Sequence, residues 1–208
     1  DIGGPTRGTA ELLLAQAKQD GDAMVASVSF LGLGKMARRS DDDELRTYVR
    51  DSLDRELADA ADESRTHLVL DAMGNSGDPA FVDELGTKLG AERASTRQHA
   101  AEALGRLDPA EAGPRLLDQL AHETDPDVSA AMVGAYHGTA TADVIALMSD
   151  KLAASTSPRE RAAIIGWLGS ASQTQPEARS QLVAHVQRET DARLVQQIGT
   201  FVPAAALR

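Results

Sequence analysis

The sequence predicts an all-α fold, a solenoid of about six stacked helix pairs. One pattern of residue types recurs about every 32 residues, and apolar residues inside each copy follow helical spacing. The composition agrees with this prediction, since 42% of the residues are hydrophobic but only 3% are aromatic. Globular cores draw much of their bulk from aromatic side chains. A chain that packs with Ala, Leu and Val instead favours small units of closely spaced helices.

The repeat is clearest in two segments, residues 124–138 and 156–170. At an offset of 32, Pro126 aligns with Pro158 and Gly134 with Gly166. Each copy is expected to hold two helices. No segment alternates with the period of two that a half-buried strand needs, so no strand is predicted. The copies also share a glycine late in the second helix, at Gly34, Gly74, Gly105, Gly169 and Gly199.

Apolar spacing and capping residues mark the individual helices. First helices are expected within residues 45–57, 81–89, 116–120, 144–152 and 182–186, and second helices within 68–73, 100–107 and 164–168. A capping side chain precedes a proline in Asp78-Pro79, Asp108-Pro109, Asp125-Pro126 and Ser157-Pro158. Proline suits the first position of a helix, where its missing N–H costs nothing. The acidic run 41–44 also fits a helix N-terminus, because its negative charge meets the positive end of the helix dipole.

Glycines inside the predicted second helices need a separate explanation. Gly134 and Gly166 each cost about 1 kcal/mol in helix propensity. We expect close approach of neighbouring helices to offset this cost. Glycines near predicted helix ends are expected to take the left-handed conformation of a C-cap: Gly74, Gly77, Gly90 and Gly138.

The formal net charge of −11 restricts the classes of partner. It opposes the phosphate backbone of nucleic acids, whose binding relies on clustered Lys and Arg. It opposes an anionic membrane surface for the same reason. The charge either serves only to solvate the protein or favours a basic partner. We therefore predict a protein or peptide partner and no nucleic acid.

Other features bound the environment of the chain. It contains no cysteine, which excludes disulfides and thiolate metal sites and leaves the compartment undetermined. No apolar run is long enough for a transmembrane helix, so no membrane insertion is predicted. Because the chain begins at Asp1 without Met, we expect it to be a piece of a larger or processed protein. A single Asn beside abundant Ala and Arg suggests a bacterial origin.

The repeating segments resemble the HEAT repeat, which begins with Asp-Pro or Ser-Pro and has a short apolar second helix ending in Ala-Leu-Gly. The residues that carry the resemblance are Asp125-Pro126-Asp127-Val128, Arg161-Ala162-Ala163, Ala103-Leu104-Gly105 and Trp167-Leu168-Gly169. The resemblance covers residues 60–200 well and residues 6–60 loosely. The resemblance implies a right-handed α-α superhelix over residues 1–208 as a single repeat domain. It also implies a concave face that binds proteins or peptides.

One phrase is similar to a second family. Residues 68–86, LVLDAMGNSGDPAFVDELG, resemble the helical N-terminal module of vitellogenin-type lipid transfer proteins. That resemblance implies a helical module of a lipid-transfer or lipoprotein-like protein, with lipid as a partner. It is the alternative to a protein-binding scaffold.

No residue pattern indicates catalysis, a cofactor or a metal. The histidines are His67, His99, His122, His137 and His185, and none of them has metal-ligand spacing. Neighbouring second helices could bring His99 near His137. Serines lack a nucleophile elbow, and no carboxylate pair has a defined cleft. Trp167 is either a core filler or a binding hot spot.

Arginines recur near the start of the second helices, at Arg65, Arg97, Arg161 and Arg193. If these helices line the concave face, the arginines and the adjacent Gln98 form a partner-binding row able to grip carboxylates. Alternatively, each arginine pairs with an acidic residue of the adjacent repeat.

Three functions remain in competition. A non-catalytic scaffold fits the regular repeats and the absence of a catalytic motif. A lipid-transfer module rests on the vitellogenin-like phrase. An enzyme of a HEAT-like class would be a DNA glycosylase or a bilin lyase. A glycosylase needs a basic, aromatic groove that this acidic chain lacks, and no residue pattern supports a bilin lyase. We therefore predict a scaffold that is not an enzyme.

Overall fold

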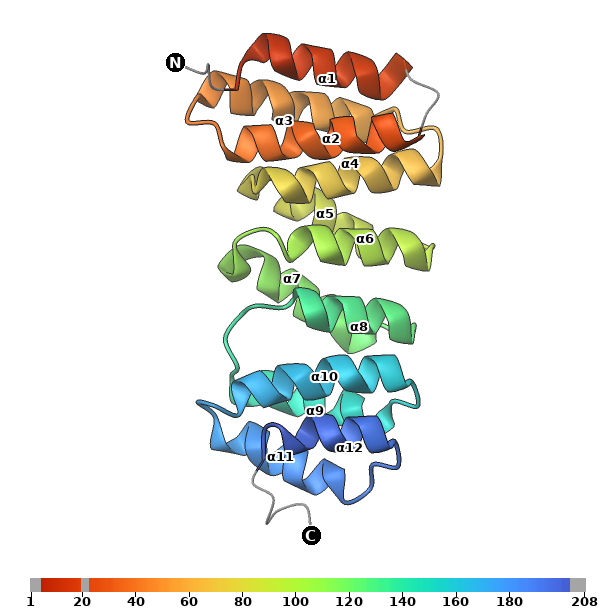
Figure 1. The fold of residues 1–208 in the computed structure, drawn as a ribbon, viewed down its shortest axis with the longest axis vertical. Helices are drawn as coiled ribbons and strands as arrows, with labels where there is room; N and C mark the ends of the chain where they lie inside the picture. The colour runs from red at the N-terminus through yellow and green to blue at the C-terminus, as the bar shows by residue number, and fades with distance from the viewer. Residues whose placement is uncertain (1–4, 20–22, 203–208) are drawn as a thin grey trace. The chain divides into compact units, whose positions relative to one another are not determined.

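The computed structural model describes residues 5–19 and 23–202 (Figure 1). Over these ranges the chain forms twelve α-helices, one short 3-10 helix and no strand, which confirms the all-α prediction. None of these helices is long and apolar enough to cross a membrane. The helices are α1 (Arg7–Gln19), α2 (Ala23–Arg38), α3 (Asp43–Ala58), α4 (Glu63–Ser76), η1 (Pro79–Phe81), α5 (Val82–Lys88), α6 (Ala94–Leu104), α7 (Pro109–His122), α8 (Pro126–Ala135), α9 (Ala142–Ala154), α10 (Pro158–Ala171), α11 (Pro176–Val186) and α12 (Ala192–Gly199).

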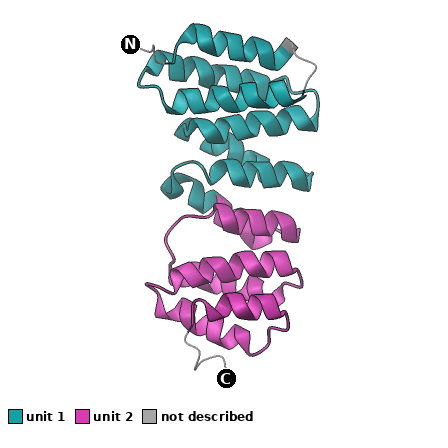
Figure 2. Ribbon diagram, in the orientation of Figure 1, with its two compact units in different colours: residues 1–115 teal, residues 116–208 magenta. Residues whose placement is uncertain are grey.

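The chain divides into two compact units, residues 1–115 and 116–208 (Figure 2). In unit 1 the second helices α2, α4 and α6 pack side by side in one layer. The first helices α1, α3 and α5 each pack against the second helix that follows them. The prediction that residues 1–208 form a single domain stays a prediction.

Unit 2 repeats this arrangement. Its second helices α8, α10 and α12 pack side by side, and the first helices α9 and α11 lie against α10 (Figure 1). Twelve α-helices in consecutive pairs confirm the predicted helical-repeat fold class. Each layer buries aliphatic side chains with few aromatics, such as Leu70, Met73 and Leu104 in unit 1 and Ile164 and Leu168 in unit 2.

The repeat period fixes which side chains meet across neighbouring helices. Glu63 accepts a hydrogen bond from Ser95, 32 residues later, and Arg159 pairs with Asp127 at the same offset, with 2.9 Å between Nη1 and Oδ1. A second set of contacts has an offset of 28, one repeat less one helical turn. Arg50 with Asp78 is one of this set, at 2.7 Å between Nη2 and Oδ2.

All four predicted helix caps are confirmed. The side-chain oxygens of Asp78, Asp108, Asp125 and Ser157 accept hydrogen bonds from backbone N–H groups of the helix that each precedes. The acidic run also caps a helix. Oδ1 of Asp42 accepts from the N–H groups of Glu44 and Leu45 at 2.9 and 3.2 Å, at the start of α3.

The glycine predictions are wrong in two respects. A side chain on Gly134 would meet nothing within 4 Å, and one on Gly166 would meet only Nε2 of Gln197 at 3.6 Å, so close helix packing does not explain either glycine. The close approaches lie at other glycines. A Cβ on Gly74 would lie 2.7 Å from Cα of Ala103, on the adjacent second helix. Among the described residues, Gly77 alone has the left-handed conformation, with φ of 66°.

Candidate binding site

The predicted partner-binding residues all lie on second helices. Arg65 is on α4, Arg97 and Gln98 are on α6, Arg161 is on α10 and Arg193 is on α12. Their side chains make different kinds of contact, and two of the arginines are held inside the protein.

Arg65 is part of an internal ion-pair cluster in unit 1. Its Nη2 lies 2.8 Å from Oε2 of Glu56, and its Nη1 donates to the carbonyl of Ala17 at 2.6 Å. Its guanidinium carbon lies 4.3 Å from the ring centre of Phe30, and Lys18 pairs with the other oxygen of Glu56 at 2.5 Å. Burial raises the pKa of Glu56, but hydrogen bonds from Lys18 and Arg65 outweigh it and hold that pKa below its ordinary value. The cluster joins α1, α2, α3 and α4.

Arg161 has an equivalent role in unit 2. Its Nε and Nη2 donate to the two carboxylate oxygens of Glu189 at 3.0 and 3.3 Å, and Nε2 of His185 lies 3.0 Å from the same carboxylate. The Glu189 side chain is 2% exposed. Burial raises the pKa of Glu189, but hydrogen bonds from the backbone of Asp191, from His185 and from Arg161 lower it overall. Arg161 therefore pairs with an acidic residue of the adjacent repeat, as the alternative interpretation expected, whereas Arg65 pairs with Glu56 of its own helix pair.

The other three predicted residues are placed differently. Arg97 donates to the carbonyls of Ala91 and Glu92, at 3.1 and 3.0 Å, in the loop before α6. The amide of Gln98 donates to Glu102 at 2.9 Å. Arg193 has an exposed side chain on α12. Partner binding by the five residues stays a prediction.

Two histidines of unit 1 stack on each other, which the sequence reasoning missed. The rings of His67 and His99 lie 4.1 Å apart at 16°. Burial, and then the neighbouring His99, lower the pKa of His67, whereas the hydrogen bond to Asp71 raises the pKa of His99. The sequence offers His137 as a possible neighbour of His99, but the ring that stacks on His99 is that of His67. The signal that identifies His67 is the repeat itself, because the two stacked residues are 32 apart.

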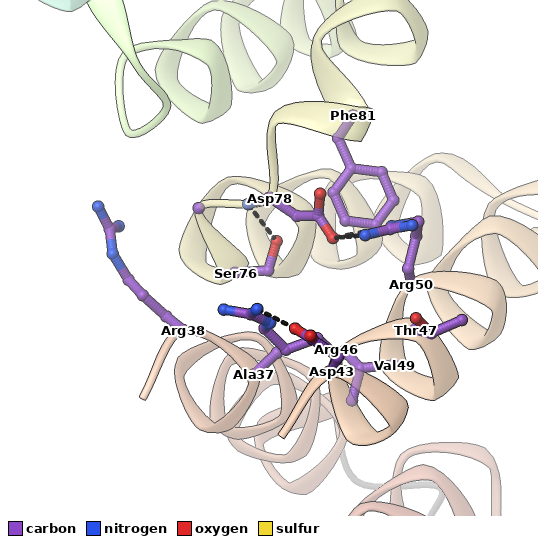
Figure 3. Close-up of a pocket in the computed structure, with 11 residues that line it drawn as sticks. Ala37, Arg38, Asp43, Arg46, Thr47, Val49, Arg50, Ser76, Asp78 and Phe81 are labelled. Atoms are coloured by element: carbon purple, nitrogen blue, oxygen red, sulfur yellow. Dashed lines mark hydrogen bonds and ion pairs between the residues drawn. The ribbon is translucent and has the colours of Figure 1, made fainter. Parts of the chain in front are cut away.

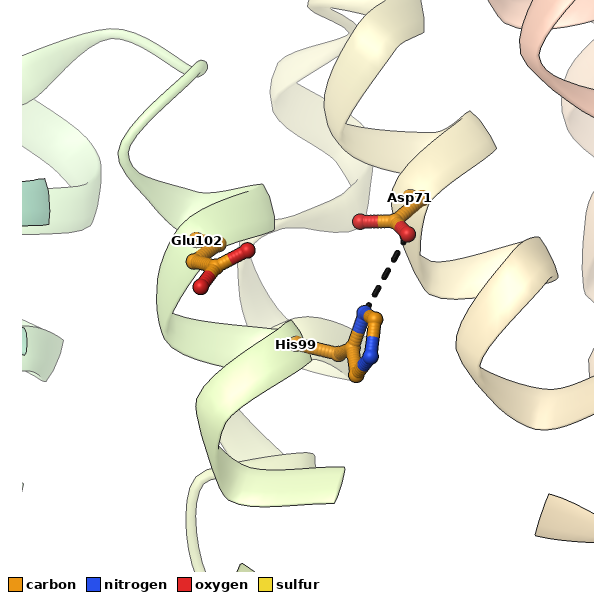
Figure 4. Close-up of side chains that lie close together, drawn as sticks. All are labelled: Asp71, His99 and Glu102. Carbon is orange, nitrogen blue, oxygen red and sulfur yellow. Dashed lines mark hydrogen bonds and ion pairs between the residues drawn. The ribbon is translucent and has the colours of Figure 1, made fainter. Parts of the chain in front are cut away.

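The carboxylate beside this stack is the centre of a polar network. Asp71, His99 and Glu102 form the one group, within the part of the chain that the structure describes, that could hold a metal (Figure 4). One ligand atom from each lies within 4.8 Å of the others. However, Nδ1 of His99 lies 3.2 Å from one oxygen of Asp71 and Nη1 of Arg106 lies 3.1 Å from the other. Asp71 is therefore satisfied without a cation, and the network joins α4 to α6.

Unit 2 contains an open groove of about 380 Å³ between α8, α10 and the turn after α8. Trp167 and Tyr136 form part of its wall, with ring centres 6.0 Å apart at 44°. Trp167 is half-buried, so it is neither a complete core filler nor a free surface residue. Gly134 and Gly166 also line this groove. Most side chains along the groove are apolar or aromatic, and its polar groups include His137, Ser170 and the Tyr136 hydroxyl.

Comparisons with known proteins agree with this fold. Residues 55–137 match the family model described as HEAT repeats. No curated protein sequence matches the chain. Of thirteen matching chains in solved structures, one belongs to the complex of CpcE and CpcF of phycocyanin lyase from Nostoc sp. PCC7120. It aligns with a TM-score of 0.58 and 21% identity, covering 95% of this chain and 76% of that one.

These comparisons and the helix pairs identify the repeats. The family match covers α4 to α8 with the adjoining end of α3, and the structural match extends the same fold over nearly the whole chain. At 21% identity the structural match shows the fold alone. The paired helices, the confirmed Asp-Pro and Ser-Pro starts and these matches together show a HEAT-type helical-repeat fold, in which residues 55–137 match HEAT repeats.

Proposed function

We propose that this chain is a non-catalytic scaffold that binds a segment of a partner protein in the groove between α8 and α10. The observation that carries the proposal is the pair of glycines on the wall of this groove. Gly134 and Gly166 stand at the same position of consecutive repeats. The space above Gly134 is open, and a Cβ on Gly166 would meet only Nε2 of Gln197.

A helical glycine that packs against nothing costs stability without an internal benefit. Gly166 lies in the middle of α10, where glycine is about 1 kcal/mol less favourable than alanine. A glycine lets another chain approach the helix backbone closely. The absence of side chains at both positions also deepens the groove. Its smooth floor therefore suits a partner segment that lies across two repeats.

The wall of the groove supplies the anchor for such a segment. Trp167 and Tyr136 belong to the residue types that dominate binding energy at protein interfaces. Their rings are already held against each other, and the hydroxyl of Tyr136 donates to the carbonyl of Thr139 at 2.9 Å. Little side-chain entropy would be lost on binding. Because most side chains along the groove are apolar or aromatic, we expect a segment that binds through apolar side chains and whose affinity depends weakly on salt.

The matched structure supports a protein as the partner. It is a complex of two proteins, CpcE and CpcF, and its fold covers 95% of this chain. The exposed Arg193, with Arg97 and Gln98, stays a candidate for polar contacts around the apolar anchor. Arg65 and Arg161 would act by holding the second helices in place.

The test fills the groove without disturbing the fold. In Gly134→Leu the new side chain enters open space, so folding should be unimpaired. Wild type, Gly134→Leu and a control, Ser180→Leu on the exposed side of the first helix α11, serve as baits in lysate of the native organism. We expect a protein retained by wild type and Ser180→Leu at moderate salt but lost with Gly134→Leu. Equal retention of the protein by all three baits would contradict binding in the groove.

The same captures test the lipid alternative. Lipid retained without any protein would favour a lipid-transfer module. Mass spectrometry of the bound material distinguishes a lipid from a peptide.

A second candidate function follows from the structural match alone. The matched chain described above comes from the complex of CpcE and CpcF of phycocyanin lyase, and this chain would then be a subunit of a similar lyase complex. Capture of phycocyanin by the wild-type chain, together with a second HEAT-repeat protein, is the expected result. If the chain captures neither phycocyanin nor a second HEAT-repeat protein, the lyase role is contradicted and only the scaffold function remains proposed.

A further inference from the structure

We propose that unit 1 contains a binding site for a small anion, a phosphate or a carboxylate. The site is a cavity of about 430 Å³ at the end of α2, beside the start of α3 and the turn between α4 and η1 (Figure 3). It lies in a different unit from the partner groove and is independent of that proposal.

Three guanidinium groups line this cavity, and they retain hydrogen-bond donors. Arg50 gives Nε and Nη2 to one oxygen of Asp78, at 2.8 and 2.7 Å (Figure 3). Arg46 pairs with Asp43, and Nη2 of Arg38 donates weakly to the carbonyl of Arg106 at 3.3 Å. A guanidinium has five N–H donors. Most of these donors therefore have no partner among the described residues and remain for a ligand.

The charge of the lining also favours an anion. Three arginines against two aspartates leave a net charge of +1 in a chain whose net charge is −11. The cavity between α3 and α5 has the opposite balance, since Asp54, Asp83 and Glu84 face one lysine there. The arginine-lined cavity is thus a local exception to the charge of the chain. Planar guanidinium groups bind phosphate and carboxylate by paired hydrogen bonds.

Buried side chains form the base of the cavity. Ala37, Val49 and Phe81 line it, and none of them is more than 4% exposed. They give the cavity its shape but offer little surface to a ligand. Binding would therefore depend on the charged and polar groups of the lining.

Contacts at the turn between α4 and η1 position two of the arginines, Arg50 and Arg38. The carboxylate of Asp78 accepts from both Arg50 and the N–H of Ala80, so the η1 cap also orients the guanidinium. Arg38 lies directly over Gly77, where a Cβ would be 3.2 Å from its guanidinium carbon. The left-handed φ of Gly77 suits glycine in any case, so one residue both ends α4 and leaves room for Arg38.

Calorimetric titration with phenyl phosphate tests the proposal, with benzyl alcohol as the neutral probe and inorganic phosphate as the bare anion. Arg46→Gln removes one lining guanidinium and only an exposed ion pair, which contributes little to stability. We expect saturable binding of phenyl phosphate by wild type and an affinity about tenfold lower for this variant. The matched control is Arg39→Gln, an exposed arginine outside the cavity, with less than a twofold change.

A variant with the opposite sign distinguishes a site from general electrostatics. Asp43→Asn removes a carboxylate that competes for Arg46, so the affinity for phenyl phosphate should rise severalfold. Equal losses in Arg46→Gln and Arg39→Gln, or no saturable binding by wild type, would overturn the site. A failure of inorganic phosphate to compete with phenyl phosphate would overturn recognition of the anionic group. Binding of benzyl alcohol as tight as that of phenyl phosphate would overturn the role of charge.

Discussion

The buried carboxylate of Glu56 makes Arg65 a stability residue. The Glu56 side chain is 7% exposed and depends on Arg65 and Lys18 for its charge. Removing one partner of a buried ion pair typically costs about 3–5 kcal/mol. Because Lys18 remains, we expect Arg65→Ala to lower the free energy of unfolding by about 3 kcal/mol, measured by urea denaturation. The control is Arg93→Ala, whose pair with Glu63 is exposed and should cost less than about 1 kcal/mol.

A second prediction at this scale concerns the pKa of His99 and its hydrogen bond to Asp71. It raises the pKa of His99, so its stabilisation is complete below the ordinary value of about 6.5 and is lost as the pH rises through the raised pKa. In Asp71→Asn we expect the pKa of His99 to fall, measured by NMR titration of the ring. His185, whose contacts lie in unit 2, should keep its titration.

The pKa of His67 is shifted in the opposite direction, and so is its effect on the pH dependence of stability. Its pKa is lowered, so it opposes folding as the pH falls through the ordinary value for histidine. An unchanged pKa of His99 in Asp71→Asn would show that the hydrogen bond does not cause the shift.

Residue patterns predicted the caps but not the turns in front of them. Five of the caps follow, by two residues, an acceptor side chain that binds the N–H of the capping residue. The acceptors are Ser40, Ser76, Glu123, Ser155 and Glu189. The spacing was visible in the sequence as Ser or Glu two positions before Asp or Ser. It was missed because the repeat was aligned on apolar residues and glycines.

At the scale of the helices, glycines of the same layer have opposite effects. A Cβ at Gly74 would lie 2.7 Å from Cα of Ala103, and backbone atoms cannot move aside cheaply. We expect Gly74→Ala to destabilise unit 1 by about 1–3 kcal/mol through overpacking. Gly166→Ala meets only ordinary contact and should stabilise unit 2 by up to about 1 kcal/mol. Chemical denaturation of the two variants checks both signs, and a loss of stability in Gly166→Ala would contradict the open groove.

The sequence could not separate these two kinds of glycine. Gly166 and Gly169 are three residues apart on α10, yet a Cβ on Gly169 would lie 2.4 Å from the ring of Phe201. Periodicity places both residues in one helix, but which face contacts the next helix depends on the rotation of α10. That rotation is set by packing across the layer, which no single repeat encodes.

At the scale of the molecule, the repeat period predicted the twelve helices and their pairing, because each repeat buries its apolar face against its neighbours. The candidate sites were less predictable. The groove of Trp167 and the arginine-lined cavity each combine residues from adjacent repeats and turns. Only the 32-residue offset, applied to polar as well as apolar residues, would have brought His67 and His99 together.

The repeat architecture also predicts how far a local loss of stability extends along the chain. In a solenoid each repeat contacts only its neighbours, so local unfolding stays local. The Arg161–Glu189 pair joins α10 to the loop before α12, and it shares no partner with the Arg65 cluster. We expect Arg161→Ala to accelerate backbone hydrogen exchange in α10, α11 and α12 while α3 and α4 keep their protection. Arg65→Ala should give the reverse pattern. Mass spectrometry of peptides from both variants measures this, and uniform acceleration through the whole chain would show one cooperative core in place of repeats.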